Sequence, residues 1–297
     1  MQLAIARQLG GKIAEIQDAT SGRQWLARHP RLAWRVPSAD ELSAKDAYVR
    51  LGDLGGWDEC CPTIAPSVYP WPPFEGRPLP DHGECWSQAP EERWENGAVE
   101  HRWRGSSLPY ELVRELRLDP EQPSLALGYR LASRAAHPLA ILWCAHPLFT
   151  IEDGMRIDVR HRTPMVVVST GSPLGAVGTR FAWPVCNGID LSEVTPDAGW
   201  AVKLYSEVLD PGEVALVGRS GGHLRIAWSS TGNAGLRLGL WLNYGGWSGD
   251  DGPLLHNLGL EPTLGMSDSL AEAIADGTAC VLEPGNERRW QLRVDVS

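Results

Sequence analysis

Apolar and polar residues alternate along much of the chain, which is the period of two that a β-strand produces. The alternation is clearest at residues 125–131, 236–242 and 290–296. Residues 139–145 and 165–169 are apolar on both faces, which is typical of central strands. Residues 214–228 form two apolar runs around a Gly-rich turn and predict a hairpin.

Helical signals are few. Residues 267–277 begin with Ser and Asp and end at a Gly, and the Ser-x-x-Glu pattern at 38–41 is a capping box, so each predicts a short helix. Further strands are expected at 12–18 and 24–27. Strands and helices do not alternate, and no repeat is visible. We therefore expect one domain over residues 1–297, an all-β sandwich or barrel with one or two short helices.

The segment from Cys61 to Pro80 fits neither a strand nor a helix, because it contains seven prolines. Proline fixes the backbone φ angle and cannot donate to a sheet, so a rigid irregular loop is expected here. Long structured loops within a domain are often functional. This one leads directly into residues 80–84, Pro-Asp-His-Gly-Glu.

Composition narrows the class of protein. The 297 residues are 43% hydrophobic and 22% charged, which is typical of a globular domain, and the net charge is −10. No cluster of Lys and Arg suggests nucleic acid or an anionic membrane as a partner, and no apolar run approaches the ~20 residues of a membrane span. The first residues lack the pattern of a signal peptide, so none is expected, and the six cysteines lack zinc-ligand spacing. A cytoplasmic protein with reduced thiols and no metal is expected.

Tryptophan is unusually frequent, with 14 residues against three Phe. Its large flat side chain suits core packing and also suits stacking on the C–H face of a sugar.

Two catalytic motifs are present only in part, because the structural or sequence context that each requires is missing. Ser220 in Gly-Arg-Ser-Gly-Gly is followed by a strand rather than a helix, so it is a hairpin residue. His82-Gly83-Glu84 lacks the cysteine half of a zinc deaminase signature.

Three polar residues remain as candidates for chemistry. His82 follows the rigid loop, and its alternative role is a surface turn. His146 follows the apolar run 139–145 and could be a general acid or base, or a core histidine bonded to a carbonyl. Glu261 stands alone in an apolar segment, where a carboxylate becomes a useful base, or else one half of a buried ion pair.

These residues lie in segments that together resemble bacterial members of the galactose mutarotase-like, or aldose 1-epimerase, superfamily. The segments are GGWDECCPTIAP (55–66), LPDHGECWSQ (79–88), LWCAHPLF (142–149), LGLWLNYGGW (238–247) and LGLEPTLGMSDSLAEA (258–273). The resemblance covers nearly the whole chain. It implies a large antiparallel β-sandwich, a small-molecule sugar substrate and no cofactor.

The resemblance also implies catalytic roles. Glu261 corresponds to the family's base, His146 to its acid, and His82 to its earlier histidine. Anomer exchange needs a base for the proton of the C1 hydroxyl and an acid for the ring oxygen. We expect Glu261 to be the base, a protonated His146 the acid and His82 a second donor. Residues expected to bind the sugar are Glu59, Asp81, Trp86, Lys203, Trp241 and Asn243.

Other functions remain open on the sequence. A carbohydrate-binding protein of the same fold would keep these residues without turnover. A glycoside hydrolase or lyase would pair Glu261 with Glu59 or Glu84, at the separations that such chemistry requires. Negative charge from Glu59 and Glu84 near His82 would suit a cationic or amino sugar. The pattern does not predict the sugar or the oligomeric state.

Overall fold

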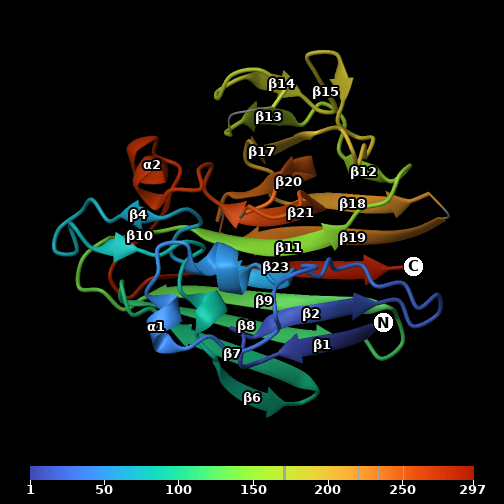
Figure 1. Ribbon diagram of the computed structural model, residues 1–297. Coiled ribbons are helices and arrows are strands. Elements are labelled where there is room, and N and C mark those ends of the chain that lie inside the picture. Colours follow the sequence, from blue (N-terminus) through green and yellow to red (C-terminus); the bar gives the residue numbers. More distant parts are fainter. Residues whose placement is uncertain (170–171, 220, 233, 250) are drawn as a thin grey trace.

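Two large antiparallel sheets pack face to face in the computed structural model, which describes residues 1–169, 172–219, 221–232, 234–249 and 251–297 (Figure 1). The first sheet has nine strands, in the spatial order β1 (Gln2–Ala6), β2 (Lys12–Gln17), β3 (Gly56–Cys60), β11 (Trp143–Thr150), β21 (Leu255–Leu264), β20 (Leu236–Trp247), β17 (Trp200–Ser206), β13 (Pro164–Val167) and β14 (Arg180–Ala182). This arrangement confirms the all-β sandwich.

The second sheet has eight strands and contains the predicted hairpin as β18 and β19. Its spatial order is β12 (Arg156–Val159), β18 (Gly212–Gly218), β19 (Gly221–Thr231), β23 (Glu287–Val296), β9 (Ser124–Ser133), β8 (Tyr110–Leu118), β7 (Ala98–Arg104) and β6 (Glu91–Glu95). Ser220, assigned to the turn of that hairpin, lies outside the described residues.

Short elements gather at one end of the sheets, on the left in Figure 1, where α1, α2, β4 and β10 lie. The helices are α1 (Ala39–Leu42), α2 (Leu270–Ala275), the π-helical turn η1 (Tyr48–Gly52) and the 3-10 turn η2 (Cys85–Ser87). Three two-stranded pairs complete the fold: β4 (Ser67–Val68) with β5 (Pro78–Leu79), β10 (Leu139–Ile141) with β22 (Cys280–Leu282), and β15 (Val185–Cys186) with β16 (Ile189–Asp190).

The hydrophobic core fills the space between the sheets and follows the alternation seen in the sequence. Leu125, Leu127 and Leu131 of β9 meet Leu238 and Leu240 of β20 in one buried cluster. Many of the tryptophans also serve packing. Those among the largest fully buried side chains are Trp25, Trp57, Trp103 and Trp143.

The structure differs from three expectations about strands. The apolar run 139–145 is divided at Leu142, because β10 pairs with β22 while β11 joins the first sheet. Residues 24–27 form isolated bridges rather than a strand. β13, expected to be central, is next to the edge strand β14. An apolar run indicates that a segment is buried but does not indicate where its strand lies in the sheet. Within the described part of the chain, no helix is long and apolar enough to cross a membrane.

Candidate active site

Glu261 projects from the face of the first sheet that lies opposite the core. Along β21, Leu258 and Leu260 enter the core cluster, and the period of two turns Gly259 and Glu261 to the other face. The Glu261 side chain is fully buried. A carboxylate on this face therefore has no water to solvate it and depends on neighbouring side chains.

The strand register aligns polar residues from four strands in one row. His146 of β11 is opposite Asp58 on the neighbouring strand β3. On the other side of β11 lies β21, and the β11–β21 register places Glu261 next to His146. Glu261 is paired with Gly239 of β20, and Gly239 is paired with Tyr205 of β17. The topology thus collects residues that are far apart in the sequence.

Two glycines on this face make room for the carboxylate. A Cβ atom added to Gly259 would lie 2.4 Å from Glu261 Oε1, and one added to Gly239 would lie 3.2 Å from Glu261 Oε2. Neither distance leaves normal van der Waals space. The missing side chains therefore determine where Glu261 can lie.

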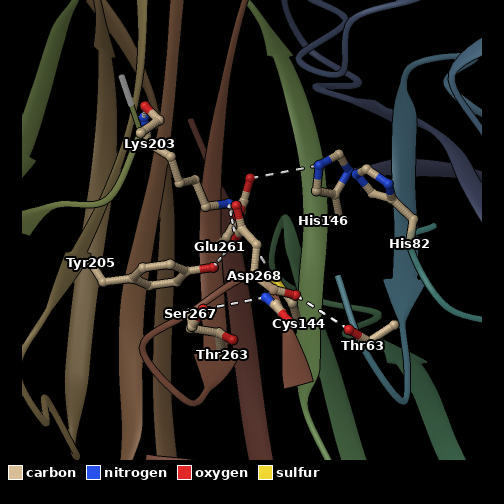
Figure 2. Close-up of polar contacts among 12 residues, drawn as sticks. Thr63, His82, Cys144, His146, Lys203, Tyr205, Glu261, Thr263, Ser267 and Asp268 are labelled. Carbon is tan, nitrogen blue, oxygen red and sulfur yellow. Dashed lines mark hydrogen bonds and ion pairs between the residues drawn. The ribbon is translucent and has the colours of Figure 1, made fainter. Parts of the chain in front are cut away.

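Lys203 forms a buried ion pair with Glu261, which is one of the alternatives the sequence left open (Figure 2). Lys203 Nζ donates to Glu261 Oε2 and lies 3.9 Å from Asp268 Oδ1. Burial alone lowers the pKa of Lys203, but the charges of Glu261 and Asp268 raise it further than burial lowers it, so the net shift is upward. The ammonium group therefore stays charged between the two carboxylates.

The second carboxylate oxygen of Glu261 is free. Oε1 is buried and has no hydrogen-bond partner, and it lies 3.7 Å from His146 Nε2. Figure 2 shows Lys203 and His146 reaching Glu261 from opposite sides. An unpaired buried acceptor is costly unless a ligand completes it. Oε1 is therefore placed to accept a proton.

The structure contradicts the expectation that His146 is protonated at rest. Burial, followed by the nearby charges of His82, Lys203 and Lys12, lowers the pKa of His146 well below its usual value. The imidazole is therefore neutral at neutral pH. It can still take up a proton during a reaction, but it does not carry one beforehand.

His82 lies beside His146 in a strained backbone conformation, with a φ of 55°. Its ring stacks on Tyr48 at a centroid distance of 3.7 Å and meets the His146 ring edge-on at 5.0 Å. His82 Nδ1 is 2.9 Å from Asp81 Oδ1, which fixes the orientation of the ring. Asp81 thus acts on His82, and the backbone strain is of the kind found at functional sites.

A second buried ion pair, between Lys12 and Asp58, is connected to His146 through Tyr48. Lys12 Nζ donates to Asp58 Oδ2, and Tyr48 Oη donates to the same oxygen at 3.1 Å. Tyr48 Oη also lies 3.4 Å from His146 Nδ1. Nearby, burial raises the pKa of Asp53 to about 6. The sequence analysis missed Lys12, Tyr48 and Asp58.

Glu59 is not at this site. Its carboxylate points between the sheets, where it accepts from Arg114 at 2.9 Å, from Tyr129 at 2.9 Å and from Trp143 at 2.8 Å. Adjacent strand residues face opposite sides, so Asp58 takes the place that was expected for Glu59. Trp57 and Glu59 lie on the same face of β3, and Trp57 is part of the core. The apolar Trp57 was therefore the signal that Glu59 faces the core and that Asp58 faces the site.

Two further expected sugar-binding residues have structural roles instead. Trp86 is buried, and its Nε1 donates to the Asp81 carbonyl at 3.3 Å. Asn243 is fully buried, and its amide bonds the main chain of Gly246 and Trp247. Trp241, which is half-buried next to Lys203 in the strand pairing, remains a predicted stacking surface.

The second carboxylate near Glu261 is Asp268, not Glu59 or Glu84. Glu84 is occupied by the main-chain N–H groups of Ser106 and Ser107 at 2.8 and 2.7 Å. Asp268 instead accepts from Tyr205 Oη and is 36% exposed. It was noted in the sequence only as part of a helix start.

The proline-rich loop positions Asp268. The main-chain N–H groups of Ile64 and Ala65 donate to the Asp268 carbonyl at 3.0 and 2.7 Å. Thr63 Oγ1 accepts from the Leu270 N–H at 3.2 Å and so connects the loop to α2. The loop therefore orders the exposed side of the site, as its rigidity suggested.

The other features of the molecule offer less chemistry. A cavity of about 1040 Å³ lies over the outer face of the second sheet, and several of its charges are paired with one another, for example Arg225 with Glu213 and Asp295. Neither Glu261 nor His146 lines it. Among the described residues, no group of three His, Cys, Asp or Glu side chains could hold a metal ion. The buried acid–base cluster on the first sheet is therefore the candidate site.

Of the comparisons with known proteins, the one with solved structures identifies the fold. A scan against protein-family models found no match, and a search of the curated proteins found none. Solved structures do match. The Slr1438 protein from Synechocystis sp. PCC 6803 is 16% identical with a TM-score of 0.69, covering 99% of this chain and 91% of that one.

Two structures from lactobacilli match equally well. A galactose mutarotase related enzyme from Lactobacillus acidophilus is 13% identical with a TM-score of 0.70, covering 99% of this chain and 94% of that one. A galactose mutarotase-like protein from Lactobacillus casei is 14% identical with a TM-score of 0.67, covering 99% and 96%. The galactose mutarotase-like fold that the sequence resembles is thus confirmed.

Proposed function

We propose that this protein is an aldose 1-epimerase-like isomerase that interconverts the anomers of a sugar. The observation that supports this most strongly is Glu261, a buried carboxylate with one oxygen paired to Lys203 and the other unpaired and directed at His146. A second imidazole, His82, lies next to His146. One base and one imidazole acid are sufficient for ring opening.

The proposed reaction conserves its protons. Glu261 Oε1 takes the proton of the C1 hydroxyl while the bond between C1 and the ring oxygen breaks. The ring oxygen takes a proton from an imidazolium group, and the free aldehyde rotates about its C1–C2 bond. Closure reverses both transfers and returns each proton to its group. Each acid–base contribution is worth about 10²–10⁴ in rate.

The substrate is proposed to be a free or modified aldose. Trp241 offers a half-buried aromatic face, and Asp268 offers a partly exposed carboxylate for hydroxyl groups. All six cysteines of the sequence are described and are free thiols, which supports the proposal of a cytoplasmic location.

Anomer exchange measured by NMR saturation transfer on a panel of aldoses, amino sugars and sugar acids tests the proposal. We expect exchange above the buffer rate for at least one sugar, and its loss in Glu261→Gln. Tyr69→Phe is the matched control, because it removes a buried hydroxyl that only accepts from the Ala140 N–H. Changes in NMR chemical shift on adding a sugar, without anomer exchange, would instead favour a carbohydrate-binding protein. In that case the ion pair of Glu261 Oε2 with Lys203 would have a structural role.

A further inference from the structure

The hydrogen bonds behind His146 determine which of its ring nitrogens carries the proton. Asp58 is 2% exposed and accepts from the Lys12 ammonium, so its carboxylate is ionised and can only accept. Tyr48 Oη donates its single proton to Asp58 Oδ2 at 3.1 Å. The tyrosine oxygen has no second proton to give and must accept from its other neighbour.

That other neighbour is His146. Tyr48 Oη and His146 Nδ1 are 3.4 Å apart, so Nδ1 has to be the donor in this contact. A neutral imidazole has one N–H, and placing it on Nδ1 leaves Nε2 with a lone pair. Nε2 faces Glu261 Oε1, which is an unpaired acceptor as well, at 3.7 Å.

Two proton acceptors therefore face each other across the site. We infer that Tyr48, held by the Lys12–Asp58 ion pair, is a positioning residue that fixes His146 as a proton acceptor, so that His82, when it carries a second proton on Nε2, is the group that protonates the ring oxygen. This inference rests on the proposed function and reverses the expected roles of the two histidines. A sugar hydroxyl between Glu261 Oε1 and His146 Nε2 would satisfy an acceptor that is otherwise unpaired.

The environment of His82 fits the donor role. Its side chain is more exposed than that of His146, at 19% against 9%, so it can exchange protons with solvent. Asp81 accepts from His82 Nδ1 and orients the ring, so the proton that His82 gives to the ring oxygen is a second one, taken up from solvent on Nε2. The His82 ring is also stacked on Tyr48, so one tyrosine contacts both imidazoles.

Long-range proton–nitrogen NMR correlations of the histidine side chains in the complete protein test the assignment without any substrate. We expect His146 to be neutral near pH 7, with Nδ1 protonated and Nε2 unprotonated. Tyr48→Phe keeps the ring that stacks on His82 and removes only the hydroxyl. It should give a mixture of the two His146 tautomers and lower kcat roughly tenfold, the equivalent of one lost hydrogen bond. Tyr69→Phe should change neither.

The outcomes separate this inference from the proposed function. A proton on Nε2 in the wild-type protein would overturn the assignment, whatever the activity. An unchanged tautomer in Tyr48→Phe would overturn the role of Tyr48. The expected tautomers without anomer exchange on any sugar would support the hydrogen-bond assignment and reject the epimerase.

Discussion

At the scale of single residues, the central feature is a carboxylate that serves two purposes. Glu261 stabilises a buried ammonium through Oε2 and leaves Oε1 free. Buried ion pairs contribute little net stability, but removing one partner leaves an uncompensated charge. The pair with Lys203 thus makes the stability of the site sensitive to the removal of either charge.

Neutralising Glu261 alone should therefore destabilise the protein as well as inactivate it. We expect Glu261→Gln to lower the free energy of unfolding by about 3 kcal/mol, because Lys203 retains only Asp268 at 3.9 Å. Combining it with Lys203→Met removes the unpaired charge and should recover most of that loss without recovering activity. Urea denaturation and the exchange assay measure the two effects. If Glu261→Gln and the double variant were equally stable, the Lys203 ammonium would have another partner that compensates its charge.

At the scale of strands, glycines shape the site. Gly259→Ala would place a Cβ atom 2.4 Å from Glu261 Oε1 and displace the proposed base. We expect about 10²-fold lower kcat with a folded protein, since a displacement of about 1 Å has this effect. The control is Gly128→Ala on β9 of the other sheet, where the nearest atom to the new Cβ is 4.0 Å away. Similar activity in both variants would contradict the position assigned to Oε1.

The strands also show how far the sequence can be interpreted. Alternation predicts β9, β20 and β23 because burial on one face acts locally on each strand. It does not predict which strands pair, since neighbours such as β3 and β11 are far apart in the chain. Among site residues, Glu261, His146 and His82 stood out because each interrupts an apolar or rigid segment.

Residues whose role depends on pairing could not be found in this way. Tyr48 lies in an irregular turn and Lys12 in an ordinary strand, and only the fold brings them to Asp58. Glu59 was chosen in place of Asp58 because the choice between adjacent strand residues depends on which face is buried. The state of His146 likewise follows from burial and from its neighbours, neither of which the sequence shows.

At the scale of the whole molecule, a polar cluster crosses the core. Arg114 of β8 in the second sheet donates to Glu59 of β3 in the first, at 2.9 Å, and also bonds His101 Nδ1 at 2.8 Å. His101 is fully buried, and its Nε2 lies 3.1 Å from Glu92. A neutral ring with its proton on Nε2 satisfies both contacts, whereas a second proton on Nδ1 would oppose Arg114.

This cluster should make stability depend on pH. Burial, followed by the charge of Arg114, lowers the pKa of His101 to about 4, against about 6.5 in the unfolded chain. Between these values the unfolded state binds the extra proton, so stability falls as the pH drops from about 6.5 to 4. The loss of stability assigned to His101 is about 3 kcal/mol.

The variant His101→Asn tests this assignment, because asparagine keeps an acceptor for Arg114 but cannot titrate. Urea denaturation between pH 7 and 4 should show the variant losing about 3 kcal/mol less than the wild type, while contributions from His146 and from carboxylates that do not contact His101 cancel in the comparison. Parallel pH curves for the two proteins would mean that the pKa of His101 is the same in the folded and unfolded states, which contradicts the assigned shift.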